Sequence, residues 1–252
     1  MSLKHLGKKE SKRKKTGIKI LDKIIRNECN IPYGSDFWNV YDFMYLDQNK
    51  LPVLKVLEIE IPSSSKYSIE SKSMKLFLNE YYKKSFKSEA LIIKSIKQKF
   101  DAFIEHPVKI RFIKKFAKEP SSVDLNKYKL VSTKKRKLYK FSGFRSICPV
   151  TKFSGFRSIC PVTSQPDFAC IFILCDEPLN TAWLKKYLIS FKEQGDFHEQ
   201  CIESIYSKIY EKYKPMNLEI CGRFQRRGGI DINPVRGNSK KKLFGNFRVF
   251  NQ

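Results

Sequence analysis

The order of apolar patterns repeats once along the chain, and this repetition restricts the fold more than any other feature. In the first half, the patterns predict two strands, two helices and a strand, at Trp38–Leu46, Leu51–Pro62, Ser73–Tyr82, Ser88–Ile104 and His106–Phe116. In the second half, they predict the same order with one more strand, at Phe153–Cys160, Asp167–Cys175, Asn180–Phe191, Phe197–Tyr213, Leu218–Phe224 and Ile230–Val235. Grouped strands and paired helices predict an α+β fold, in which two helices cover one face of each antiparallel sheet.

A second repeat is literal, because Lys140–Thr151 and Lys152–Thr163 both read KFSGFRSICPVT. Identity over the whole segment indicates a recent duplication, an engineered insertion or a sequence error, not a family of diverged structural repeats. It supplies two equivalent cysteines, Cys148 and Cys160. Only Cys160 is followed seven residues later by an acid, Asp167, whereas Gly155 stands at that distance from Cys148 and has no proton to donate.

The chain is strongly basic, with 50 Lys and Arg against 25 Asp and Glu and a formal charge of +25. Such an excess is typical of proteins that bind nucleic acid or anionic membranes. The lysines are spread along the whole chain, however, so solvated surface lysine is the simpler interpretation, and a nucleic-acid groove stays open as the alternative. Hydrophobic residues make up 41% of the sequence, which excludes a disordered charged protein.

No segment predicts a membrane span or an export signal. The longest apolar run, Phe168–Cys175, is too short to cross a bilayer, and the residues before Arg26 contain no apolar stretch long enough for a signal peptide. The seven cysteines have no regular spacing, so we expect reduced thiols in a cytoplasm. We also expect no metal, because no HxH, HExxH or CxxC pair is present.

Two short motifs contain residues typical of catalysis. Cys160 at a strand end could be a nucleophile, with Asp167 as the proton donor to an intermediate. The alternative is a small core residue, as most free cysteines are. His198 and Glu199 open a predicted helix, where the carboxylate could accept paired N–H donors from a purine-like base. The alternative is a helix-start acid beside a partly buried histidine.

Two cationic segments predict anion binding. Glu70–Lys75 (ESKSMK) combines hydroxyls, helix-start amides and two lysines on one face, although an ordinary capped amphipathic helix would have the same pattern. Arg226–Gly229 (RRGG) would let the backbone approach a phosphate, and Arg suits a 2′-phosphate, although a strand-connecting turn is the alternative. No GxGxxG motif is present, so the usual Rossmann fingerprint is absent.

Four segments in this order resemble one family: ESKSMKLFLN, FRSICPVTSQPDFA, YLISFKEQGDFHEQC and RFQRRGGIDINPVR. It is the QueF family of NADPH-dependent nitrile reductases of queuosine biosynthesis, a tRNA modification pathway, in its long two-module form. The similarity runs from about Trp38 to Arg236. The resemblance implies two tandem tunnelling-fold (T-fold) modules, a homodimer, and reduction of 7-cyano-7-deazaguanine to 7-aminomethyl-7-deazaguanine with two NADPH.

The resemblance also implies a role for each matching residue. Cys160 would attack the nitrile carbon and form a covalent thioimide, and Asp167 would donate protons. The substrate-binding residues would be Ile69, Glu70, Ser71, His198 and Glu199. The NADPH-binding residues would be Ser71, Lys72, Arg227 and Gly228. This chemistry needs a soft nucleophile, an acid and a hydride source, and it needs no metal.

The literal repeat departs from the family, in which a single copy forms the strand that leads to the nucleophile. We therefore assign that strand to the second copy. The expected divisions are a basic N-terminal segment (1–30), a first T-fold module (31–118), a linker that includes the first copy (119–152), and the module with the nucleophile (153–252).

Two other functions stay open from the sequence. Another T-fold enzyme, such as a cyclohydrolase or pterin synthase, would need a zinc-binding set of histidines and cysteines that the sequence lacks. A basic RNA-binding T-fold-like module without reductase activity would use lysines for phosphates and aromatic side chains for base stacking. The reductase itself requires no direct contact with nucleic acid and no membrane.

Overall fold

The computed structural model describes residues 16–28, 30–127 and 150–252. The chain divides into two compact units, which we describe separately. The first consists of Ser35–Lys115 with Arg226–Ile232 and the segment before Cys29, and the second consists of Phe116–Gln225 with Cys29–Gly34 and Asn233–Gln252. Strand β10 (Ile230–Gly237) therefore begins in the first unit and ends in the second.

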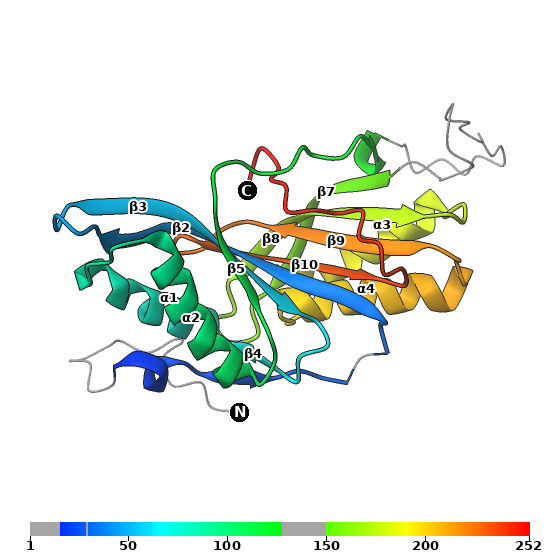
Figure 1. The fold of residues 1–252 in the computed structure, drawn as a ribbon. Coiled ribbons are helices and arrows are strands. Elements are labelled where there is room, and N and C mark those ends of the chain that lie inside the picture. Colours follow the sequence, from blue (N-terminus) through cyan, green and yellow to red (C-terminus); the bar gives the residue numbers. More distant parts are fainter. Residues whose placement is uncertain (1–15, 29, 128–149) are drawn as a thin grey trace. The chain divides into compact units, whose positions relative to one another are not determined.

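The first unit contains a sheet of antiparallel strands with the order β5-β3-β2. Its main elements are β2 (Tyr33–Leu46), β3 (Pro52–Pro62), α1 (Ser71–Leu78), α2 (Glu89–Ile104) and β5 (Lys109–Ile113). A smaller antiparallel pair consists of β1 (Lys23–Ile25) and β4 (Tyr67–Ile69). Short 3₁₀ helices are η1 (Gly17–Ile20) and η2 (Asn79–Lys83). Figure 1 shows α1 and α2 on one side of β2 and β3.

Strand alternation explains which face of this sheet the helices cover. Leu57, Ile59 and Ile61 of β3 are fully buried in the core that also includes both helices. Glu58 lies between them in sequence and points to the other face, where it pairs with Arg111 of β5. On α2, the buried residues recur every four positions, at Ile92, Ile96, Phe100 and Ile104.

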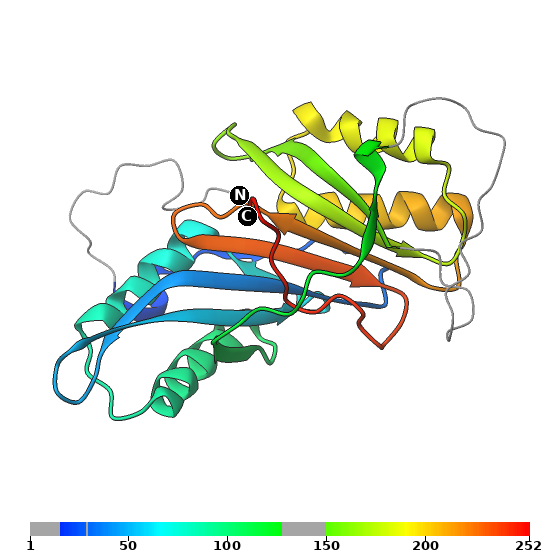
Figure 2. The same ribbon diagram turned by 90° about the horizontal axis from the view of Figure 1, so that it is seen from above.

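The second unit contains strands in the order β10-β9-β8-β7-β6. Its elements are β6 (Ser122–Asp124), η3 (Leu125–Lys127), β7 (Val150–Ile159), β8 (Pro166–Cys175), α3 (Thr181–Ser190), η4 (Phe191–Glu193), α4 (His198–Tyr213) and β9 (Leu218–Phe224). All neighbours within this sheet are antiparallel except β6 and β7, which are parallel. Figure 2 shows α3 and α4 beside these strands.

The two faces of β8 pack against different partners. Ala169, Ile171 and Ile173 alternate into the core that contains α3 and α4. Phe172 points to the opposite face, where its ring contacts those of Phe244 and Phe247 from the C-terminal segment. That segment is also held by polar contacts, because the buried Glu219 carboxylate accepts the N–H groups of Leu243 and Phe244 at 2.8 Å.

The structure confirms the predicted α+β class and every predicted strand and helix, with differences at their ends. Helix α1 begins at Ser71, two residues before the predicted start, because the Glu70 carboxylate caps it. The segment expected as a linker (119–152) contains the short strand β6. In the part of the chain that the structure describes, no helix is long and apolar enough to cross a membrane.

Strand β7 contains the second copy of the literal repeat up to Ile159, as expected, but begins at Val150 within the first copy. The rest of the first copy, including Cys148, lies outside the described residues, as does the basic start through residue 15.

Candidate functional site

The β7–β8 hairpin positions the candidate nucleophile and acid. Cys160 directly follows β7, and its N–H donates to the Gln165 carbonyl while its carbonyl accepts the Ser164 N–H, which closes a tight connection. Ser158 of β7 is the cross-strand partner of Asp167 in β8, so these two side chains point to the same face of the sheet. Ala169, two residues after Asp167, belongs to the core with α3 and α4, so this is the face that the helices cover.

The start of α4 lies at the same end of the hairpin. Ile159 donates its N–H to Gln194 and bridges Gly195, which fixes the segment that leads into α4 beside Cys160. His198, the first residue of α4, then lies with Nε2 3.2 Å from Oδ1 of Asp167. Asp167 is 5% exposed. The predicted acid and the predicted histidine are therefore in direct contact, although they are far apart in sequence.

His198 has one satisfied and one unsatisfied ring nitrogen. With Nε2 against the Asp167 carboxylate, Nδ1 is buried and has no hydrogen-bond partner among the residues that the structure describes. A buried polar atom in this state favours a ligand that supplies the missing partner. The imidazole also stacks on Phe224, with ring centroids 3.8 Å apart and planes 7° apart. The motif RFQRRGG contained Phe224, but nothing in its pattern pointed to this contact.

The cysteines of this unit differ in accessibility. Of the five that the structure describes, Cys160 alone is partly exposed, and all are free thiols. Burial raises the pKa of Cys201 to about 12 and that of Cys221 to about 11, and it also raises the pKa of Cys170. A buried thiol with a raised pKa is a poor nucleophile at neutral pH. Accessibility therefore selects Cys160 among these residues.

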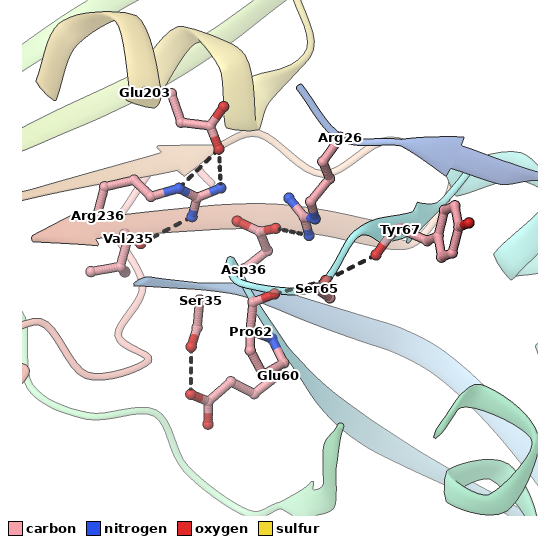
Figure 3. A network of polar contacts seen from close by, with 10 residues as sticks. All are labelled: Arg26, Ser35, Asp36, Glu60, Pro62, Ser65, Tyr67, Glu203, Val235 and Arg236. Atoms are coloured by element: carbon pink, nitrogen blue, oxygen red, sulfur yellow. Dashed lines mark hydrogen bonds and ion pairs between the residues drawn. The ribbon is translucent and has the colours of Figure 1, made fainter. Parts of the chain in front are cut away.

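Glu199 lies in the first turn of α4, partly buried. One turn later, Glu203 accepts hydrogen bonds from the fully buried Arg236 of β10, at 3.0 Å to Nε and 2.6 Å to Nη2 (Figure 3). Residues four apart share one side of a helix, so this pair fixes the side of α4 that presents Glu199. This ion pair could not be predicted from the sequence, because no local pattern joins the two residues.

In the first unit, Glu70 caps a helix, which agrees with the predicted alternative of an ordinary capped helix. Its Oε1 accepts the N–H of Lys72 and its Oε2 accepts the N–H of Ser73, both at 2.7 Å. The Glu70 side chain is almost fully buried, as is Ile69 before it at the end of β4. Ser71 donates its hydroxyl to the same carboxylate at 3.3 Å. This carboxylate is thus the N-cap of α1.

The glycine pair forms a turn, as one of the two alternatives predicted. Arg227 and Ile230 exchange backbone hydrogen bonds, and both intervening glycines have positive φ, 57° at Gly228 and 84° at Gly229. Helix α1 approaches this turn, since Lys75 donates to the Gly228 carbonyl and lies 3.4 Å from the Asp42 carboxylate. The ESKS helix and the RRGG turn therefore form one cationic group within the first unit.

The predicted site residues fall into two groups. Cys160, Asp167, His198 and Glu199 lie in the second unit, and Ile69, Glu70, Ser71, Lys72, Arg227 and Gly228 lie in the first. Within the described ranges, no cluster of three or more histidines, cysteines or acids could hold a metal ion.

Comparisons with known proteins agree on one family. A family model described as nitrile reductase, 7-cyano-7-deazaguanine-reductase N-term, matches residues 12–112, and one described as QueF-like protein matches residues 166–243. The chain is 33% identical over 246 residues to the NADPH-dependent 7-cyano-7-deazaguanine reductase of Buchnera aphidicola subsp. Schizaphis graminum, covering 88% of this chain and 89% of the relative.

Two relatives with the same name in other bacteria have the same sequence identity to this chain. The protein of Desulfotalea psychrophila is 33% identical over 248 residues, covering 88% of this chain and 85% of its own. That of Bordetella avium is 33% identical over 228 residues, covering 82% and 79%. Together with the accessible cysteine beside the Asp167–His198 pair, these matches show that the chain belongs to the QueF family of 7-cyano-7-deazaguanine reductases.

Proposed function

We propose that the protein reduces the nitrile of 7-cyano-7-deazaguanine to the aminomethyl group of 7-aminomethyl-7-deazaguanine, with a covalent thioimide on Cys160. The observation that carries this proposal is the contact between Asp167 and His198 beside the one described cysteine that is accessible. A nitrile carbon is attacked best by a soft nucleophile, and the nitrogen must gain a proton as its bond order falls.

The proposed reaction consists of two reductions, first of the thioimide and then of the imine. The Cys160 sulfur forms a bond to the nitrile carbon, and the thiol proton reaches the nitrile nitrogen through Asp167, which gives the thioimide. NADPH, held by Ser71, Lys72, Arg227 and Gly228, would supply the two hydrides that the thioimide and the imine need. Cys160 leaves as the thiolate when the C–S bond breaks after the first reduction, and it then regains a proton. Asp167 delivers the last proton to the imine nitrogen, so two NADPH and two protons are consumed.

Binding of the base would use the start of α4. The unpartnered Nδ1 of His198 and the carboxylate of Glu199 would contact polar edges of the deazaguanine. Ile69, Glu70 and Ser71 stay predicted substrate contacts from the family resemblance. Because both Glu70 oxygens accept amides of α1, any substrate contact would share an acceptor that already caps the helix.

The cationic group of the first unit fits the phosphates of NADPH. The Gly228–Gly229 turn exposes backbone without side chains, and Lys75 lies against it. Ser71, Lys72, Arg227 and Gly228 would hold the cofactor, with the cations on its phosphates. From the same resemblance we propose tandem T-fold modules, a homodimer and a cytoplasmic role in queuosine biosynthesis.

Mass spectrometry of protein incubated with the nitrile but without NADPH tests this function. The expected result is a covalent adduct on the peptide that contains Cys160, which disappears when NADPH is added. Cys160→Ala should give no adduct, and Cys148→Ala, which changes the identical position of the first copy, should give the full adduct. An adduct on Cys148, or a Cys160→Ala protein with full NADPH turnover, would overturn the assignment.

A further inference from the structure

The ring of Phe224 forms a platform for the His198 imidazole. Phe224 is the last residue of β9 and is fully buried, and its ring lies almost parallel to the imidazole, 3.8 Å between centroids. The ring of Phe156 meets Phe224 edge-on, at 6.1 Å and 86°. A ring packed in this way has one allowed plane, so it can impose that plane on the imidazole.

Gly222 supplies the space in which this ring lies. A Cβ atom added at Gly222 would be 2.6 Å from Cε2 of Phe224 and 2.8 Å from Cδ1 of Ile202. Residues two apart on a strand point to the same face, so any side chain at this position would push the Phe224 ring away from the sheet. Residue 222 must therefore be a glycine if the Phe224 ring is to keep this position.

The platform and the Asp167 contact together fix both torsions of the His198 side chain. The stack defines the plane of the imidazole, and the 3.2 Å contact from Nε2 to Asp167 defines its rotation within that plane. An N–H on Nε2 facing the carboxylate leaves the lone pair on Nδ1, the buried atom without a described partner. The direction of that lone pair is then set by Phe224 and Asp167 together.

We propose that Phe224, seated by Gly222, is a positioning residue that orients His198 for contact with the deazaguanine substrate. The proposal rests on the proposed function for its ligand, but the orientation itself is a property of the free protein. It predicts that loss of the aromatic ring at residue 224 changes the orientation of the imidazole and weakens substrate binding. The affinity for NADPH should not fall to the same extent.

The first measurement needs no substrate. The chain has three histidines, so the ring protons of His198 can be assigned by NMR through His198→Asn. A stacked phenyl ring shifts them upfield. Phe224→Leu should remove this shift, Phe224→Tyr should keep it, and Gly222→Ala should reduce it. Unchanged His198 resonances in Phe224→Leu would overturn the proposal.

The second measurement is calorimetric binding of 7-cyano-7-deazaguanine in a Cys160→Ala background, which prevents covalent capture. Phe224→Leu should weaken binding by about 2- to 10-fold, the range expected for one lost aromatic stack, and Phe224→Tyr should restore it. The affinity for NADPH should stay within about twofold, since the cation group lies in the other unit.

Phe172→Leu is the matched control, because Phe172 is an equally buried phenylalanine of the same unit on the opposite face of the sheet. If it weakens substrate binding as much as Phe224→Leu at an equal loss in thermal midpoint, Phe224 acts only through general packing and the proposal is wrong. If the Cys160→Ala parent binds no nitrile at all, the proposed function fails, and the NMR arm still decides the orientation of His198.

Discussion

Two helices, α1 and α4, have an acid next to their first residue, and the structure uses the two acids differently. Both oxygens of Glu70 accept amides of α1, so the start of that helix is internally satisfied. At α4, Glu199 lies within the first turn, and the preceding His198 keeps a buried nitrogen without a described partner. An acid near a helix start is therefore a structural cap in the first unit, whereas the start of α4 in the second unit keeps a buried nitrogen without a described partner.

The strongest test of this contrast is Asp167→Asn. An amide at this position still contacts His198 but cannot donate the proton, so kcat for nitrile reduction should fall about 10²- to 10⁴-fold, the range for a lost general acid. The control is Asp176→Asn at the other end of β8, where the carboxylate accepts hydrogen bonds from the backbone and the side chain of Asn217. Equal turnover in Asp167→Asn and the parent, measured by NADPH oxidation, would remove Asp167 from the mechanism.

Alkylation with iodoacetamide at pH 8 compares thiols within the second unit. With a pKa of about 12, Cys201 is thiolate in roughly one molecule in 10⁴ at this pH. A raised pKa means that labelling of Cys201 should rise only as the pH approaches that value or as the protein unfolds. Peptide mapping should therefore show early labelling of Cys160 and late labelling of Cys201 and Cys221. Simultaneous labelling in folded protein would contradict the burial described above.

In the first unit, the turn that joins β9 to β10 should be sensitive to added side chains in a graded way. Gly229→Ala places a Cβ against the Asp42 carboxylate at a φ of 84°, so we expect a loss of about 2–3 kcal/mol in the free energy of unfolding. At Gly228 the nearest atom would be Nζ of Lys75 at 3.3 Å, which can move. Chemical denaturation of Gly228→Ala should show the smaller loss, and the reverse order would show that Asp42 does not constrain the turn.

The smallest expected effect is the difference in the free energy of unfolding between two variants, one at each helix start. Glu70→Ala removes the acceptor of two amides and should lower the free energy of unfolding by about 1 kcal/mol. Glu199→Ala should lower it less, because Glu199 is not the N-cap of its helix. Affinity for the deazaguanine, in contrast, should fall clearly in Glu199→Ala. If Glu70→Ala leaves the thermal midpoint unchanged, the cap does not stabilise α1.

The elements could be predicted because their signals are local. The spacing of Ile92, Ile96 and Phe100 indicates a helix without any knowledge of its neighbours, and the alternation of Leu57 and Ile59 indicates a strand. The start of α1 was predicted two residues too late, because a Glu cap gives a weaker start signal than Ser or Asp.

Residues of the candidate site could be predicted only where they belong to a family motif. Cys160, Asp167, His198 and Glu199 followed from family motifs, but the contact of Asp167 with His198 depends on how β8 packs against α4. The platform at Phe224 and the pair of Arg236 with Glu203 join residues more than 20 positions apart, and no periodicity reports such pairs. The second role of Glu70, as a cap, depended on the actual start of α1.

The start of β7 has a genetic consequence. Deletion of either copy of KFSGFRSICPVT produces the same polypeptide, in which Leu138 and Tyr139 come directly before the remaining copy. The residues that now pair with Ser122 and Val123 of β6 are Val150 and Thr151, from the end of the first copy. Contraction of the gene to one copy would thus keep the candidate nucleophile, Cys160, and the sequence of its hairpin. It would change only two residues of β7, at the edge that faces β6.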